Sequence, residues 1–144
     1  MHSFMKFVRM ILYIQVVLPK TFLWFPLELK NIKLEVMTWN ERLSRYDEIV
    51  LKCPRFERKG KTVPYTSANG HMFSLLNKEG ELGFRFSKTV QEKYIKDWDA
   101  GYLISHNATM KGYVRIPEEM FSDLDQLAAY LNESFDYVMS LDPK

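Results

Sequence analysis

The sequence predicts a single α+β domain in which helices cover one face of an antiparallel sheet of about four to five strands, a two-layer sandwich. Helix-type and strand-type segments alternate along residues 37–144. Most strand-type segments are joined by short loops typical of hairpins. Their apolar and polar residues alternate, whereas a parallel sheet buried on both faces would show continuous apolar runs. The length of 144 residues and the hydrophobic content of 47% suit one domain with its own core.

Residues 1–36 differ in composition from the rest of the chain. They carry five basic and two acidic residues, against 15 basic and 16 acidic residues in 37–144. Their apolar run Met10–Leu18 follows two basic residues, as in a signal peptide, but Pro19 and Lys20 interrupt it and no small-residue cleavage site follows. The run is also shorter than the roughly 20 apolar residues that span a membrane.

Three interpretations of residues 1–36 stay open. The start codon is mis-assigned and the protein begins at Met37, or the segment is a membrane anchor or re-entrant segment, or it is an extra element packed on the domain. We favour the first interpretation, because the composition changes at Met37, directly before a helix start.

The first predicted helix begins after Thr38 and ends near Leu51. Thr38 and Glu41 fit a capping box, in which each side chain satisfies a free backbone amide of the other residue. Apolar residues then recur on one helical face, at Trp39, Leu43, Tyr46 and Val50. Pro54 prevents the helix from continuing.

Short strands follow. One is expected at Thr62–Thr66, after a basic stretch. Residues 71–76 and 82–86 are apolar runs on either side of a five-residue loop that contains Gly80, which predicts a hairpin.

A second helix, a strand pair and two further helices are expected in the second half of the domain. Ser87 can cap a helix over Lys88–Asp97. A second strand pair is expected at Tyr102–Ser105 and Met110–Ile116, and Pro117 suits the first turn of a short helix. The last helix opens at residues 122–125 and ends near Leu141, with apolar residues at helical spacing.

Few residues predict chemistry. Cys53, His71 and His106 lack the spacing of a metal site, so no metal ligand is predicted. Glycine-rich nucleotide-binding loops are absent from the sequence, and no cofactor is predicted. The carboxylates at 118–119 and 123–125 lie at expected helix starts, where the helix dipole explains them. No catalytic residue is predicted, and we expect the protein not to be an enzyme.

One basic patch is a candidate binding surface. Four positive charges fall within seven residues, and aromatic residues are their neighbours. Such a run is typical of a solvated strand edge, and it can also hold a phosphate or an acidic partner. Lys111, Tyr113 and Arg115 share one face of a predicted strand and would extend this basic and aromatic surface. The full set of candidate binding residues is Arg55, Arg58, Lys59, Lys61, Tyr65, His71, Lys111, Tyr113 and Arg115.

The stretch from Arg58 to Leu76, the segment 80–86 and the later 110–117 resemble the amino-terminal domain of TfoX/Sxy-type competence regulators. The resemblance covers most of 37–144, and it is closest to small stand-alone bacterial members. It implies a fold similar to α+β secretion-chaperone-like domains and carries no catalytic residues. The chain departs from the family's glycine-rich segment, since residues 65–70 contain one glycine, and it has no room for the regulators' second domain.

Three functions are therefore compatible with the sequence. The leading hypothesis is a small cytoplasmic, non-enzymatic domain that binds a protein partner or itself in a regulatory role. The second is a nucleic-acid-associated regulator that uses the basic patch. The third is a small-ligand binder or enzyme with a site near Tyr65, His71 and Tyr113. Contact with a membrane is expected only if residues 1–36 are a genuine part of the protein.

Overall fold

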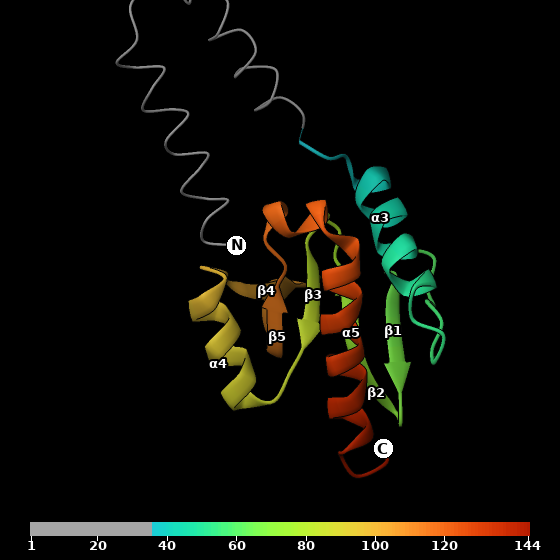
Figure 1. Ribbon diagram of the computed structural model, residues 1–144, viewed down its shortest axis with the longest axis vertical. Coiled ribbons are helices and arrows are strands. Elements are labelled where there is room, and N and C mark those ends of the chain that lie inside the picture. The colour runs from blue at the N-terminus through green and yellow to red at the C-terminus, as the bar shows by residue number, and fades with distance from the viewer. Residues whose placement is uncertain (1–35) are drawn as a thin grey trace, which may run out of the picture.

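The computed structural model describes residues 36–144 (Figure 1). The predictions for the 1–36 extension therefore lie outside the described residues, apart from Val36. The described chain runs from an α-helix through three strands and a second helix to two more strands, a short 3₁₀ helix and a final α-helix. It is an α+β fold with five antiparallel strands and three α-helices packed on the sheet, which confirms the predicted two-layer sandwich.

The first described helix, α3, spans Trp39–Leu51 and has the predicted capping box. The Glu41 amide donates to the Thr38 hydroxyl at 3.2 Å, and the Thr38 amide donates to the Glu41 carboxylate at 3.2 Å. The helix buries Tyr46, Ile49 and Val50 against the sheet and α5.

The sheet has the strand order β1-β2-β3-β5-β4, and all neighbours are antiparallel. The strands are β1 Tyr65–Ala68, β2 His71–Leu76, β3 Leu82–Arg85, β4 Tyr102–Ser105 and β5 Ala108–Arg115. The hairpin expected around Gly80 joins β2 and β3. The register of β1 and β2 shifts between Thr66 and Ser67, so that Phe73 is left without a partner of its own in β1.

The strand expected at Thr62–Thr66 begins at Tyr65 instead. The backbones of Lys59 and Tyr65 bond to each other at 2.7 and 2.9 Å and close a loop between them. Pro64, directly before the strand, has no N–H to give to a ladder. The segment before Tyr65 therefore turns instead of extending the sheet.

Strand β4 lies across the outer face of the sheet. Its Leu103 side chain covers Gly83 of β3, although β5 stands between these strands in the sheet order. The Asn77 side chain, at the end of β2, donates to the Ile104 carbonyl at 2.8 Å. Figure 1 shows β4 at a steep angle to β3 and β5. Leu103 thus joins a small second core on this face with Leu75 and Tyr113.

The remaining helices are α4 Lys88–Asp97, the 3₁₀ helix η2 Glu118–Ser122 and α5 Leu124–Met139. Helices α3 and α5 lie side by side over the same face of the sheet (Figure 1). Helix α4 has the predicted bounds, and Ser87 caps it. Helix α5 ends two residues before the expected Leu141, and the Asn69 side chain donates to the carbonyls of Val138 and Leu141 at its end.

The main core lies between the helices and the sheet. It contains aromatic residues from both layers, among them Phe73, Phe84 and Phe86. Helix α4 joins it through Tyr94 and Trp98, whose rings stack at 4.3 Å, and the Tyr94 hydroxyl donates to the Glu133 carboxylate of α5.

A cluster of three hydroxyl groups is buried within this core. Tyr46 of α3 hydrogen-bonds to Ser74 of β2, which in turn hydrogen-bonds to Thr66 of β1. All three residues have no exposed surface. Burial raises the pKa of the Tyr46 hydroxyl far above its usual value. The cluster therefore stays neutral and ties α3 to two strands.

Among residues 36–144, no helix combines the length and the apolar character needed to cross a bilayer.

Candidate functional site

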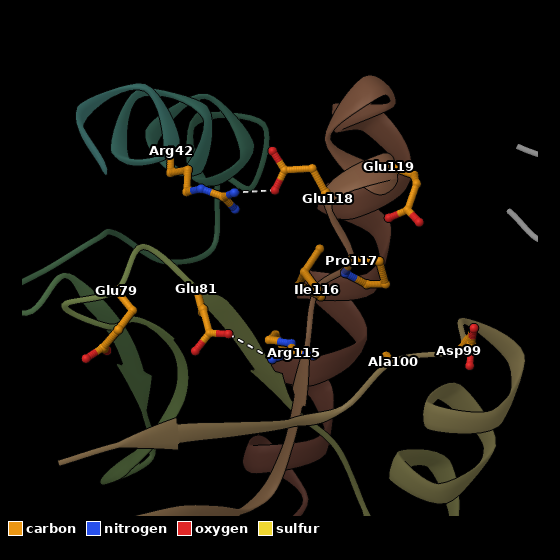
Figure 2. Close-up of a pocket in the computed structure, with 10 residues that line it drawn as sticks. All are labelled: Arg42, Glu79, Glu81, Asp99, Ala100, Arg115, Ile116, Pro117, Glu118 and Glu119. Atoms are coloured by element: carbon orange, nitrogen blue, oxygen red, sulfur yellow. Dashed lines mark hydrogen bonds and ion pairs between the residues drawn. The ribbon is translucent and has the colours of Figure 1, made fainter. Parts of the chain in front are cut away.

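A polar cleft lined mostly by charged residues lies at one end of the sheet (Figure 2). It encloses about 320 Å³. Four parts of the chain build it: α3, the loop between β2 and β3, the loop before β4, and the segment from the end of β5 into η2. The lining residues are Arg42, Glu79, Glu81, Asp99, Ala100, Arg115, Ile116, Pro117, Glu118 and Glu119.

Two ion pairs lie across the cleft. Arg42 of α3 pairs with Glu118 of η2. Arg115 at the end of β5 pairs with Glu81, with 2.8 Å between the Arg115 Nη1 and the Glu81 Oε2. Figure 2 shows the two pairs one above the other, with Ile116 and Pro117 beside them. Each pair joins two segments that are far apart in sequence.

Asn77 holds the loop that carries the glutamates of the cleft. Its side chain accepts from the Glu81 amide at 2.8 Å and donates to the Glu81 carboxylate at 3.0 Å. Its carbonyl accepts from the Trp39 indole at 3.0 Å. Gly80 follows with a φ of +81°, and a Cβ there would lie 3.1 Å from the Arg42 side chain. The loop is therefore fixed against α3 and β4, and a glycine makes room for Arg42.

Negative charge is in excess in the cleft. Five carboxylates face two guanidinium groups, and the two ion pairs use only Glu81 and Glu118. Within the described part of the chain, the side chains of Glu79, Asp99 and Glu119 form no ion pair or hydrogen bond. Because residues 37–144 have a net charge near zero, this surplus is a local feature of the cleft.

The side chains that line the cleft are mostly carboxylates and guanidinium groups. None of its ten residues is a serine, threonine, cysteine or histidine, so the cleft presents no side chain of the usual nucleophile types apart from carboxylates. Across residues 36–144 no three His, Cys, Asp or Glu residues come together in a way that could hold a metal ion. The arrangement is suited to recognising a charged group.

The structure divides the predicted basic patch. Arg55 pairs with Asp136 of α5 at 2.8 Å, and its guanidinium lies 4.5 Å from the centre of the Phe135 ring. Arg58 pairs with Asp47 of α3. Asp136 of α5 and Asp47 of α3 thus form ion pairs with two of the four positive residues of this patch.

Lys59 and Lys61 are the exposed remainder of the patch. The Lys59 Nζ lies 3.5 Å from the Ser67 hydroxyl, and Lys61 is exposed. Two exposed lysines on one loop agree with a solvated strand edge.

The residues expected to extend this patch lie elsewhere. Arg115 belongs to the cleft, through its ion pair with Glu81. Lys111 is exposed on β5. Tyr113 is only 4% exposed and belongs to the small core on the outer face. The expectation of a surface position for Tyr113 is therefore wrong, and the reason is that β4 folds over this face.

Tyr65 and His71 take part in local packing. Tyr65 packs against the small outer core. The His71 Nε2 lies 2.8 Å from the Asp142 carbonyl, so His71 joins β2 to the residues that follow α5. The Tyr113 hydroxyl is buried and has no hydrogen-bond partner within residues 36–144. Burial raises its pKa, so it is a neutral group.

Sequence reasoning missed most of the cleft. Only Arg115 was among the candidates, and Glu118 and Glu119 were explained by a helix start. Both residues do lie in the first turn of the 3₁₀ helix η2, and Glu118 also reaches across to Arg42 of α3. The sequence does place carboxylates in three short segments, at 79–81, 99 and 118–119. No local pattern predicts that these three segments meet in the folded domain.

Comparisons with family models, with curated proteins and with solved structures found no match for this chain.

Proposed function

We propose that this domain is a protein-interaction module with a regulatory role, and that the cleft is its docking site. One observation carries the proposal: three carboxylates from three separate segments, Glu79, Asp99 and Glu119, line one polar cleft and have no ion-pair partner among the described residues. Glu79 and Asp99 are exposed and Glu119 is half-buried, so a partner can reach all three carboxylates.

Two further points support this assignment. The cleft lining contains no thiol, hydroxyl or imidazole, which favours binding over nucleophilic catalysis. The resemblance to the amino-terminal domain of TfoX-type competence regulators also favours a regulatory binding domain. We regard nucleic acid as the weaker candidate partner, because Asp136 and Asp47 pair with two of the four patch charges.

The proposal is tested with the tagged full chain in an extract of its native source, treated with nuclease. We expect a protein partner that the wild type retains and the Glu79→Lys/Glu119→Lys variant loses, since charge reversal repels whatever the cleft attracts. The matched control is Glu57→Lys/Glu92→Lys, which changes the net charge equally at exposed positions outside the cleft.

Two results would contradict the proposed function. One is recovery that disappears with nuclease, which would indicate nucleic acid. The other is a partner that both variants retain as well as the wild type does.

A further inference from the structure

We infer that a second pocket, between the loop after β2 and the β4–β5 turn, binds inorganic phosphate. A buried hydroxyl without a partner, the donors beside it and a single carboxylate together point to this ligand. The pocket encloses about 290 Å³. Its lining residues are Val63, Lys78, Glu79, Ser105, His106 and Asn107. The site is independent of the proposed function, although Glu79 lines both the cleft and this pocket.

Ser105 is the residue whose burial calls for a ligand. It is only 7% exposed, and its hydroxyl forms no hydrogen bond with any described residue. Buried hydroxyl groups in folded proteins are normally hydrogen-bonded. The side chains of the other buried polar residues within 36–144 all have partners, namely those of Thr66, Ser74, Asn77, Gln91 and Ser134. Because Ser105 lines the pocket, a molecule bound there can supply the missing partner.

Three further side chains bring hydrogen-bond donors to the same pocket. Lys78 adds an ammonium group, which forms no ion pair with the described residues. His106 and Asn107 form the tight turn between β4 and β5, where both have a positive φ, as a two-residue hairpin turn requires. An imidazole donates a hydrogen bond in either protonation state, and an amide has two N–H donors. The pocket therefore offers a positive charge and several donors to one oxyanion.

The two walls of the pocket are tied together by Asn77. This residue directly precedes Lys78, and its side chain donates to the carbonyl of Ile104, which directly precedes Ser105, at 2.8 Å. Asn77 is 2% exposed, so this hydrogen bond is shielded from water. The backbone that carries the donors is thus fixed before a ligand arrives, which lowers the entropy cost of binding.

Glu79 distinguishes phosphate from other oxyanions. Its carboxylate lines the pocket and forms no ion pair or hydrogen bond with the described residues. In Figure 2 it lies at the end of the cleft away from Asp99 and Glu119. An ionised carboxylate only accepts hydrogen bonds. Inorganic phosphate keeps at least one proton at neutral pH and can donate it to Glu79, whereas sulfate has no proton to donate and is repelled.

The size of the pocket excludes larger phosphate compounds. Pockets for drug-sized ligands have volumes of about 300–1,000 Å³, so this pocket suits a small ion with its water. Val63 is the one apolar side chain in the lining, which offers little surface for a base or a lipid chain. A phosphate monoester also loses its last proton with a pKa of about 6, so at neutral pH it has lost the donor that Glu79 accepts.

The test is a titration of the ¹⁵N-labelled full chain with sodium phosphate at pH 7.5 and constant ionic strength, followed by two-dimensional NMR. We expect the backbone amide signals of Lys78, Ser105 and His106 to shift and to saturate. Sodium sulfate and glycerol 3-phosphate should require about tenfold higher concentrations for the same shifts. Constant ionic strength separates binding at the pocket from general screening by salt.

Three variants assign the roles of the residues. Lys78→Gln should weaken phosphate binding about tenfold, and Ser105→Ala about fivefold. Glu79→Gln should bring sulfate binding close to phosphate binding, because the amide carries no negative charge. The matched control is Lys111→Gln, which removes one positive charge at an exposed position outside the pocket and should bind phosphate as the wild type does.

Thermal unfolding separates binding from stability for the buried position. Because the Ser105 hydroxyl has no partner among the described residues, Ser105→Ala should unfold at a temperature no lower than that of the wild type. Signals that drift without saturating, or a Lys78→Gln variant that binds phosphate as well as the wild type does, would overturn the inference. Wild-type protein that binds sulfate or glycerol 3-phosphate as tightly as phosphate would overturn it too. The pull-down tests the cleft separately, so either proposal can fail alone.

Discussion

Arg42 and Tyr46 lie one helical turn apart on the same side of α3, yet they belong to two polar clusters of opposite kinds. Tyr46 enters the buried hydroxyl cluster with Ser74 and Thr66. Arg42 enters the cleft, where it pairs with Glu118. The first cluster is neutral and has no exposed surface, whereas the second is charged and open to solvent.

The difference shows how polar groups that stabilise the fold can be separated from polar groups that are free to bind. The three hydroxyls bond to one another, so the cluster offers nothing to a ligand. In the cleft, three carboxylates and most of the guanidinium N–H groups have no partner among residues 36–144. The first cluster should therefore control stability, and the second should control binding.

The largest effect is expected from Tyr46. Tyr46→Ala removes a fully buried ring and one hydrogen-bond partner of the Ser74 hydroxyl, which should lower the free energy of unfolding by about 3–5 kcal/mol. Tyr46→Phe removes only the hydroxyl and should cost about 1–3 kcal/mol. Urea denaturation followed by tryptophan fluorescence measures both. A Tyr46→Phe variant as stable as the wild type would show that the cluster does not stabilise the fold.

A smaller effect on stability is expected from Gly83, which tests how closely β4 packs on the outer face of the sheet. A Cβ at Gly83 would lie 2.5 Å from the Leu103 Cδ2, so Gly83→Ala should cost about 1–3 kcal/mol in unfolding free energy. The additional change Leu103→Ala should recover part of that loss, because it removes the clashing atom. If the two substitutions are simply additive in thermal unfolding, β4 does not press on β3 as the structure shows.

The elements that could be predicted from the sequence are those set by neighbouring residues. The Thr38–Glu41 capping box, the helix Lys88–Asp97 and the hairpin around Gly80 all depend on contacts within a few positions. The start of β1 was predicted three residues too early, because the backbone pairing of Lys59 with Tyr65 is not visible in apolar alternation.

The outer face and the cleft depend on contacts between distant residues. The alternation of residue types along β5 predicted that Tyr113 lies on a solvent-exposed face of the sheet. No local pattern indicates that β4 folds back and covers this face. Arg115 was chosen for its charge and for sharing a strand face with Lys111, but its partner Glu81 lies 34 positions earlier. Arg42 and Glu118 are 76 positions apart and meet only in the folded domain.

The smallest effect on stability is expected at the Arg42–Glu118 ion pair of the cleft, and this pair tests the comparison most directly. A double-mutant cycle with Arg42→Gln and Glu118→Gln should give a coupling energy below about 1 kcal/mol, since the Glu118 side chain is 48% exposed. The coupling should also fall as salt is added. A coupling above about 2 kcal/mol that salt does not change would show that this pair stabilises the fold, as the hydroxyl cluster is expected to do. The cleft would then be a structural junction between α3 and η2, and only Glu79, Asp99 and Glu119 would remain to attract a partner.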